Sequence, residues 1–135
     1  MKVVVADDSR AFLAVVQRAL QSAGYESVGV TSWLELPKTV ARERPDAVVI
    51  DASMPVLEGI QLVEVTRRHW PELPIVLMAG EPFGELANQA QAAGATAYVA
   101  KTDVPTQLGR VIDHVLRRRT ATGRHPRVQG DAKGR

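Results

Sequence analysis

The stretch Val48-Val49-Ile50-Asp51 is a short apolar run that ends on a carboxylate. Similar apolar runs are found at Val3-Val4-Val5-Ala6, Ile75-Val76-Leu77-Met78-Ala79 and Tyr98-Val99-Ala100. Uninterrupted apolar runs of this length are typical of strands buried on both faces, as in a parallel sheet. Parallel strands have their carboxyl ends at one edge of the sheet, where open α/β folds place their sites. The sequence therefore predicts one site at that edge.

Charged residues directly follow three of these runs. Asp7 and Asp8 follow the run that begins at Val3, Asp51 ends the run that begins at Val48, and Lys101 follows the run that begins at Tyr98. Three acids and one amine at a single edge are suited to holding a divalent cation and a phosphoryl group.

Helical patterns alternate with the strands. The strands include a second, weakly predicted one over 27–30. Ser9 is a plausible N-cap for a first helix that ends at Gly24. The second helix is capped by Ser32, but Pro37 requires it to start late or to kink. Further helices are predicted over 59–69, over 86–93 and from Pro105 onward. Strict alternation predicts an α/β fold with a doubly wound five-stranded parallel sheet in the flavodoxin-like order 2-1-3-4-5.

The composition fits one globular domain with 135 residues and 45% apolar residues. There is no cysteine, so disulfides and thiolate metal sites are excluded. No apolar run is long enough to cross a bilayer, and the N-terminus enters a strand without a signal-peptide layout. We therefore expect a cytoplasmic protein that makes no membrane contact.

The net charge of +2 conceals an uneven distribution. Residues 1–116 carry ten Lys/Arg and fourteen Asp/Glu, whereas residues 117–135 carry seven Lys/Arg and one Asp. The predicted division is a globular domain over 1–119 and a basic, disordered tail or linker stub over 120–135. The tail contains no helix-turn-helix pattern and no aromatic residues, so binding to nucleic acid is not expected.

Taken together, these motifs resemble the receiver domain of bacterial two-component response regulators. The resemblance rests on Asp7-Asp8, on Asp51-Ala52-Ser53-Met54-Pro55 followed by Gly59, and on Lys101. It extends from Lys2 to about Leu116. It implies a signalling module rather than a turnover enzyme, with a sensor histidine kinase or a phosphotransfer protein as the phosphoryl donor.

The resemblance also implies a role for each matching residue. Asp51 would be the phosphoacceptor, and Lys101 would contact the phosphoryl oxygens. Mg²⁺ would be held by Asp8, Asp51 and the main-chain carbonyl of Ser53, with Asp7 assisting through water. A downstream protein would dock on the face formed by helix 4, strand 5 and helix 5, and a homodimer is a further option.

Three positions bear on how such a receiver would respond. Ala79 stands where receivers usually have Thr or Ser, although the main-chain N–H of Gly80 could still donate to a phosphoryl oxygen. Thr102 stands where receivers usually have proline. Tyr98 matches an aromatic residue that changes rotamer in receivers, and a static packed aromatic is an equally good interpretation. We expect phosphorylation to survive and the conformational response to weaken.

Several alternatives remain. The chain could be a degenerate receiver that binds partners without phosphorylation, or the receiver fragment of a larger regulator. An aspartate-nucleophile phosphatase needs Asp-x-Asp after the first strand, whereas this chain has Asp7-Asp8-Ser9. A nucleotide- or flavin-binding protein needs a glycine-rich phosphate loop, which the sequence lacks.

Overall fold

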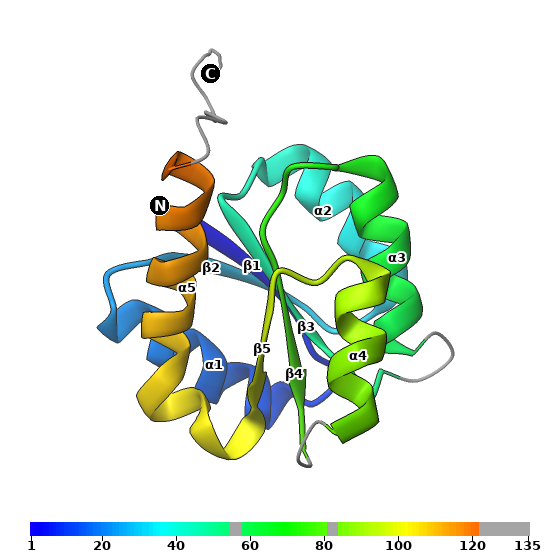
Figure 1. Cartoon of the computed structure of the whole chain (residues 1–135). Helices are drawn as coiled ribbons and strands as arrows, with labels where there is room; N and C mark the ends of the chain where they lie inside the picture. The colour runs from blue at the N-terminus through cyan, green and yellow to red at the C-terminus, as the bar shows by residue number, and fades with distance from the viewer. Residues whose placement is uncertain (55–57, 81–83, 122–135) are drawn as a thin grey trace.

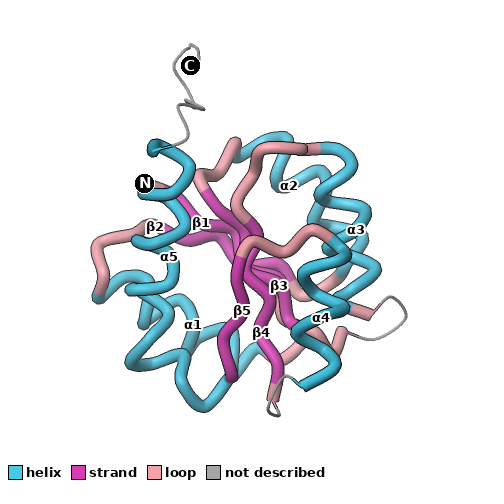
Figure 2. Tube along the Cα trace, viewed as in Figure 1, coloured by secondary structure: helices cyan, strands magenta, loops and turns pink. Residues whose placement is uncertain are grey.

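The computed structural model describes residues 1–54, 58–80 and 84–121, and its centre is a five-stranded parallel sheet (Figures 1 and 2). The strand order is β2-β1-β3-β4-β5, which confirms the predicted doubly wound topology. The strands are β1 (Lys2–Ala6), β2 (Glu26–Val30), β3 (Ala47–Asp51), β4 (Ile75–Ala79) and β5 (Ala97–Ala100).

Five α-helices cover the two faces of the sheet (Figure 1). They are α1 (Arg10–Ser22), α2 (Leu36–Glu43), α3 (Gly59–His69), α4 (Gly84–Ala93) and α5 (Val104–Ala121). Helices α1 and α5 pack on one face, and α2, α3 and α4 pack on the other. Among the described residues, no helix combines the length and the hydrophobicity of a membrane span.

Alternation along the central strands divides the core into two layers. On β3, Val48 and Ile50 point into the layer beneath α2, α3 and α4, whereas Val49 points into the layer beneath α1 and α5. All of β3 and β4 is buried, because these strands have neighbours on both edges and helices on both faces. This explains why their sequences are continuous apolar runs.

The helix signals in the sequence have identifiable structural counterparts. The Oγ of Ser9 accepts a hydrogen bond from the N–H of Phe12 at 3.2 Å, which confirms the predicted cap of α1. Ser32 caps a short 3₁₀ turn, and α2 begins after it with Pro37 in its first turn. The late start follows because proline has no N–H to donate inside a helix.

The last two helices begin earlier in the structure than predicted, and α5 continues beyond its apolar stripe. Helix α4 begins at Gly84, before the apolar period that starts at Leu86. Helix α5 begins at Val104 rather than at Pro105, directly after a 3₁₀ turn over Lys101–Asp103. It continues to Ala121, past the end of its apolar stripe, because a helix that has been nucleated can extend over polar residues.

Gly59 allows α3 to start directly against the loop that follows β3. Its N–H donates to the carbonyl of Ala52 at 3.1 Å. A Cβ atom on residue 59 would lie 2.4 Å from the Cα of Ala52 and 2.5 Å from the carbonyl oxygen of Asp51. Any side chain here would displace the main chain at the end of β3. Pro55, which belongs to the motif that follows β3, lies outside the described residues.

Candidate functional site

Three carboxylates meet at the carboxyl edge of the sheet. One oxygen from each of Asp7, Asp8 and Asp51 lies within 4.8 Å of the others. The register explains the meeting, since Ala6 of β1 pairs with Ile50 of β3 and the acids follow both positions. Asp7 and Asp51 are buried, whereas the adjacent Asp8 is exposed. This set could hold a metal ion, because carboxylate oxygens are hard ligands.

Lys101 supplies the positive charge beside this cluster. Its Nζ lies 3.1 Å from Oδ1 of Asp51 and 3.8 Å from Oδ2 of Asp7. The same Nζ lies 4.9 Å from the ring centroid of Phe12 on α1. Sequence reasoning gives Phe12 no role at the site, so its place beside Lys101 was missed.

Among the described residues, each of the two buried carboxylates has one oxygen that accepts a hydrogen bond and one that does not. The N–H of Ser53 donates to Oδ1 of Asp51 at 3.1 Å, and the N–H of Ser9 donates to Oδ1 of Asp7 at 2.9 Å. Oδ2 of Asp7 and Oδ2 of Asp51 are buried and accept no hydrogen bond from the described residues. Buried polar atoms normally have a hydrogen-bond partner, so these two oxygens are candidate contacts for a ligand.

The electrostatics of Asp7 also indicate a site that lacks positive charge. Burial raises the pKa of Asp7 from its ordinary value of 3.8 to about 6. The hydrogen bond from Ser9 opposes this shift, the negative charge of Asp51 adds to the increase in pKa, and Lys101 lowers the pKa again. The single ammonium group therefore does not compensate for three carboxylates, and a bound cation would complete the balance.

The remaining predicted residues surround this cluster. Ala79 ends β4, is 4% exposed and pairs with Ala100 of β5. Gly80 follows it in an exposed bend. Tyr98 of β5 is 47% exposed. Thr102 lies in the 3₁₀ turn that leads into α5, and the described residues include no cis peptide bond.

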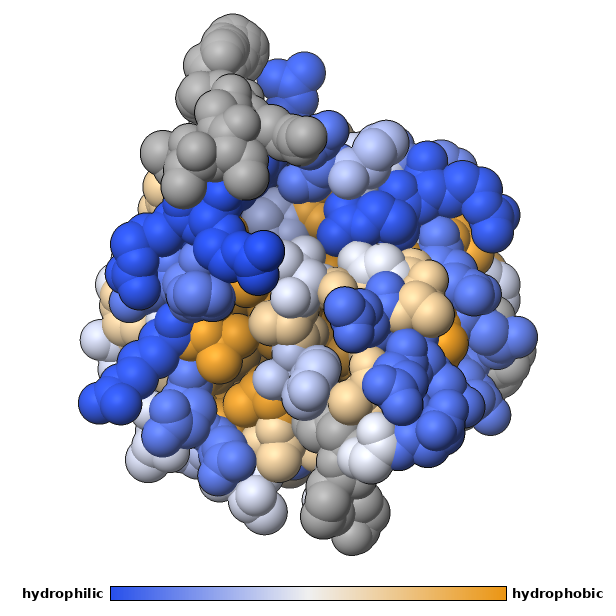
Figure 3. Space-filling model, in the orientation of Figure 1, coloured by the Kyte–Doolittle hydropathy of each residue, from blue (hydrophilic) through white to orange (hydrophobic). Residues whose placement is uncertain are grey.

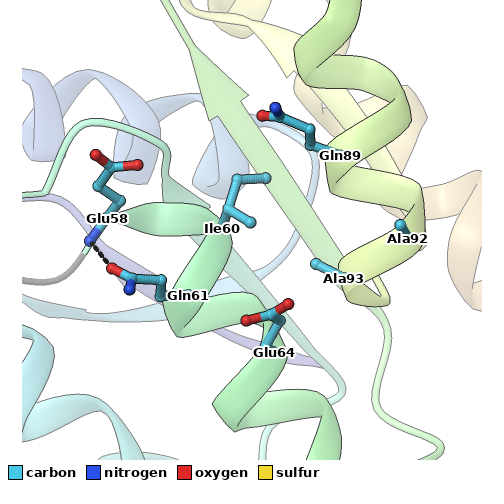
Figure 4. A pocket seen from close by; sticks show the side chains of 7 residues that line it. All are labelled: Glu58, Ile60, Gln61, Glu64, Gln89, Ala92 and Ala93. Carbon is cyan, nitrogen blue, oxygen red and sulfur yellow. Dashed lines mark hydrogen bonds between the residues drawn. The ribbon is translucent and has the colours of Figure 1, made fainter.

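A separate groove of about 460 Å³ lies between α3 and α4 (Figure 4). Glu58, just before α3, and Glu64 of α3 are among the residues that line it, and Ile60 lies between them. The main-chain N–H of Glu58 donates to the side chain of Gln61 at 3.1 Å, which caps the start of α3. None of the carboxylates in the cluster lines this groove, so it is distinct from the site.

Comparison with known proteins assigns this arrangement to a family. A family model described as response regulator receiver domain matches residues 3–113. The transcriptional regulatory protein PrrA of Mycobacterium tuberculosis is 31% identical over 121 residues, which is 90% of this chain and 52% of that protein. The alkaline phosphatase synthesis transcriptional regulatory protein PhoP of Bacillus subtilis is 27% identical, over 87% of this chain and 49% of that protein. This chain thus spans about half the length of these relatives.

Solved structures agree with the family model. The chemotaxis protein CheY4 of Vibrio cholerae superposes with a TM-score of 0.79 at 29% identity, covering 84% of this chain and 97% of that one. A response regulator receiver domain protein from Clostridium thermocellum has the same fold, with a TM-score of 0.82 at 23% identity over 90% and 98% of the two chains. The chain belongs to the receiver domain family of two-component response regulators.

Proposed function

We propose that this receiver accepts a phosphoryl group on Asp51 from a phosphohistidine of a sensor histidine kinase or a phosphotransfer protein. The observation that carries the proposal is the difference between the two side-chain oxygens of Asp51. Its Oδ1 is held by Ser53 and Lys101, whereas its buried Oδ2 accepts no hydrogen bond from the residues that the structure describes. A carboxylate held at one oxygen presents the other as a nucleophile.

The chemical step is an in-line transfer between two side chains. Oδ2 of Asp51 forms a bond to phosphorus while the bond from phosphorus to the donor's imidazole nitrogen breaks. The imidazole leaves with the electron pair of that bond. Water later hydrolyses the acyl phosphate, which restores Asp51 and releases inorganic phosphate. Because the phosphoryl group serves here as a signal, we do not propose a role as a turnover enzyme.

The residues present fit a Mg²⁺ ion, because the candidate ligands are all oxygens and two buried carboxylate oxygens accept no hydrogen bond within the described part of the chain. Asp8, Asp51 and the main-chain carbonyl of Ser53 would hold the ion, with Asp7 acting through water. When bound, the ion screens the negative charge of the incoming phosphoryl group. Lys101 is within reach to pair with a phosphoryl oxygen as a compact cation.

The signal would leave through the face formed by α4, β5 and α5, which we name the α4–β5–α5 face. Figure 3 shows hydrophobic side chains between α5 and α4, bordered by hydrophilic ones. A hollow of about 430 Å³ on this face is lined by Tyr98 and Arg118 among others. Helix α5 also exposes Arg110 and Arg117. We expect a downstream protein with an apolar centre and acidic flanks, and these arginines make a homodimer through the same face less favourable.

The length comparison favours a second candidate, the receiver fragment of a larger regulator. The relatives PrrA and PhoP are named transcriptional regulatory proteins, and this chain spans about half of each. In that case any contact with DNA would belong to a part outside this span. Both candidates place the receiver in the cytoplasm, together with its donor.

Acetyl phosphate tests the proposed function without knowledge of the kinase. The wild-type protein with Mg²⁺ should gain one phosphoryl mass per chain, and alkaline treatment should remove it because acyl phosphates are labile. A matched sample in EDTA should gain none. No mass change with Mg²⁺, or the same change in EDTA, would contradict the proposal and favour a receiver that acts without phosphorylation.

Mg²⁺ should raise the melting temperature of the protein, since a ligand that binds only the folded state stabilises it. At a concentration 100 times the dissociation constant, the gain in unfolding free energy is about 2.7 kcal/mol. Asp8→Ala should remove most of this gain, whereas Glu26→Ala, at the exposed start of β2, should keep it. If Mg²⁺ raised the melting temperature of Asp8→Ala as much as that of the wild type, the ion would have to bind elsewhere.

Ala79→Thr should enlarge the response of the α4–β5–α5 face to a phosphoryl mimic. A ligand shifts a conformational equilibrium only through contacts that differ between the two states, and the added hydroxyl would provide one. The measurement is the amide chemical-shift change of Tyr98 on adding beryllofluoride. Ala79→Val is the matched control, because it adds similar bulk without a hydroxyl. Equal changes in wild type, Thr and Val proteins would show that the response does not depend on this hydroxyl.

A further inference from the structure

We propose that Phe12 is a positioning residue, whose aromatic ring holds the ammonium group of Lys101 beside Asp51. The Nζ of Lys101 lies 4.9 Å from the ring centroid of Phe12, which is within the range of a cation–π interaction. The effect on phosphoryl transfer rests on the function proposed above. The contact itself does not depend on that function.

The main chain fixes the place of the ring. Ser9 caps α1 by accepting a hydrogen bond from the N–H of Phe12, so Phe12 stands in the first turn of the helix, four residues after Asp8. The side chain of Phe12 is half-buried and packs against the core layer between the sheet and helices α1 and α5. The ring thus has support on its core side and presents an aromatic surface to Lys101.

The lysine needs such support because its other partners change during the reaction. The side chain of Lys101 is 23% exposed, and its ammonium group contacts Asp51 at 3.1 Å and Asp7 at 3.8 Å. A bound cation and a phosphoryl group would interact with the same two carboxylates and so change their contacts with Lys101. The ring of Phe12 is the neutral partner among these three contacts, so its attraction to the ammonium group stays constant throughout.

A long lysine side chain has considerable rotamer freedom, and an anchor that reduces this freedom favours the reactive geometry. A partly desolvated cation–π contact has a modest effect. We therefore expect loss of the ring to slow phosphorylation about three- to tenfold rather than to abolish it. If Phe12 served only to fill the core, Phe12→Leu should leave the phosphorylation rate nearly unchanged, because leucine fills much of the same apolar space.

The first test uses the wild-type chain and its variants without any phosphodonor. Protons that lie over an aromatic face move upfield, so the ε-methylene protons of Lys101 should be shifted upfield in the wild type. Phe12→Leu should remove the shift and Phe12→Tyr should retain it. Unshifted ε-methylene protons in the folded wild type would overturn the proposal, whatever the outcome for phosphorylation.

The second test measures the rate of phosphorylation by acetyl phosphate at saturating Mg²⁺. Phe12→Leu should be about three- to tenfold slower, Phe12→Tyr should be close to wild type, and Val111→Ala, which trims the same core layer on α5, should leave the rate unchanged. In a Lys101→Met background, Phe12→Leu should cause no further loss. The same loss with and without Lys101, or a full rate in Phe12→Leu, would overturn the role in transfer. A wild type that gains no phosphoryl group would refute the proposed function alone, and the proton shifts would then decide the contact.

Discussion

Replacing Asp7 with Asn is expected to stabilise the metal-free protein at pH 7 by about 1–3 kcal/mol. Burial raises the pKa of Asp7 to about 6 from 3.8, and each pH unit of such a shift corresponds to about 1.4 kcal/mol. Ionisation of Asp7 at neutral pH therefore destabilises the folded protein relative to the unfolded one. Asn removes this cost, and its side-chain oxygen can still accept the hydrogen bond from the N–H of Ser9.

The pH dependence of this gain follows from the direction of the shift. Between pH 3.8 and about 6 the folded state binds more protons at Asp7 than the unfolded state does. The contribution of Asp7 to stability is therefore lost as the pH rises through this window, and it stays lost above it. The advantage of Asp7→Asn should be small at pH 4, grow up to about pH 6 and then level off.

Urea denaturation in EDTA at pH 4, 5, 6 and 7 measures this gain. Asp103→Asn, at an exposed position, is the matched control and should show no such rise. Mg²⁺ should reduce the advantage of Asp7→Asn, because the ion stabilises the ionised carboxylate. A variant that is less stable than the wild type at pH 7, or an advantage that does not change with pH, would contradict this account of the buried charge.

Asp51→Asn is expected to abolish phosphorylation by acetyl phosphate completely. The amide has almost the shape of the carboxylate, and its oxygen can still accept from the N–H of Ser53. It lacks the anionic oxygen that attacks phosphorus, so the covalent step cannot occur. Intact-mass measurement after incubation with Mg²⁺ and acetyl phosphate should show only the unmodified chain.

Asp46→Asn is a suitable control for this loss, because Asp46 precedes β3 at the opposite edge of the sheet. It should gain the phosphoryl mass as the wild type does. Melting curves should show that both variants are folded. Undiminished incorporation in Asp51→Asn would transfer the acceptor role to another residue and overturn the assignment.

The topology could be predicted because each central strand is a continuous apolar run. A buried parallel strand requires this pattern, and acids that follow such strands all lie at the carboxyl edge of the sheet. The meeting of Asp7, Asp51 and Lys101 follows from that edge alone. The predicted start of α4 was wrong, since Gly84 and Glu85 precede the apolar stripe and leave no periodic signal.

The fine structure of the site could not be predicted because it depends on distances between segments far apart in sequence. Asp7 is fully buried and its neighbour Asp8 is exposed, a contrast set by the N–H of Asp7, which still donates to Val30 of β2. Phe12 contacts Lys101 although the two residues are far apart in the sequence. In the sequence, the cap at Ser9 places Phe12 in the first turn of α1 but does not fix the direction of its ring.

Chemical trapping of the phosphorylated wild-type protein tests the central claim most directly. Borohydride reduces the acyl phosphate of an aspartate to homoserine, so peptide sequencing by mass spectrometry identifies the acceptor residue. After treatment with acetyl phosphate and Mg²⁺, homoserine should be found at position 51 and should be absent from positions 7 and 8. Homoserine at position 7 or 8, or none at position 51 in a sample that carries the phosphoryl mass, would contradict the assignment of Asp51.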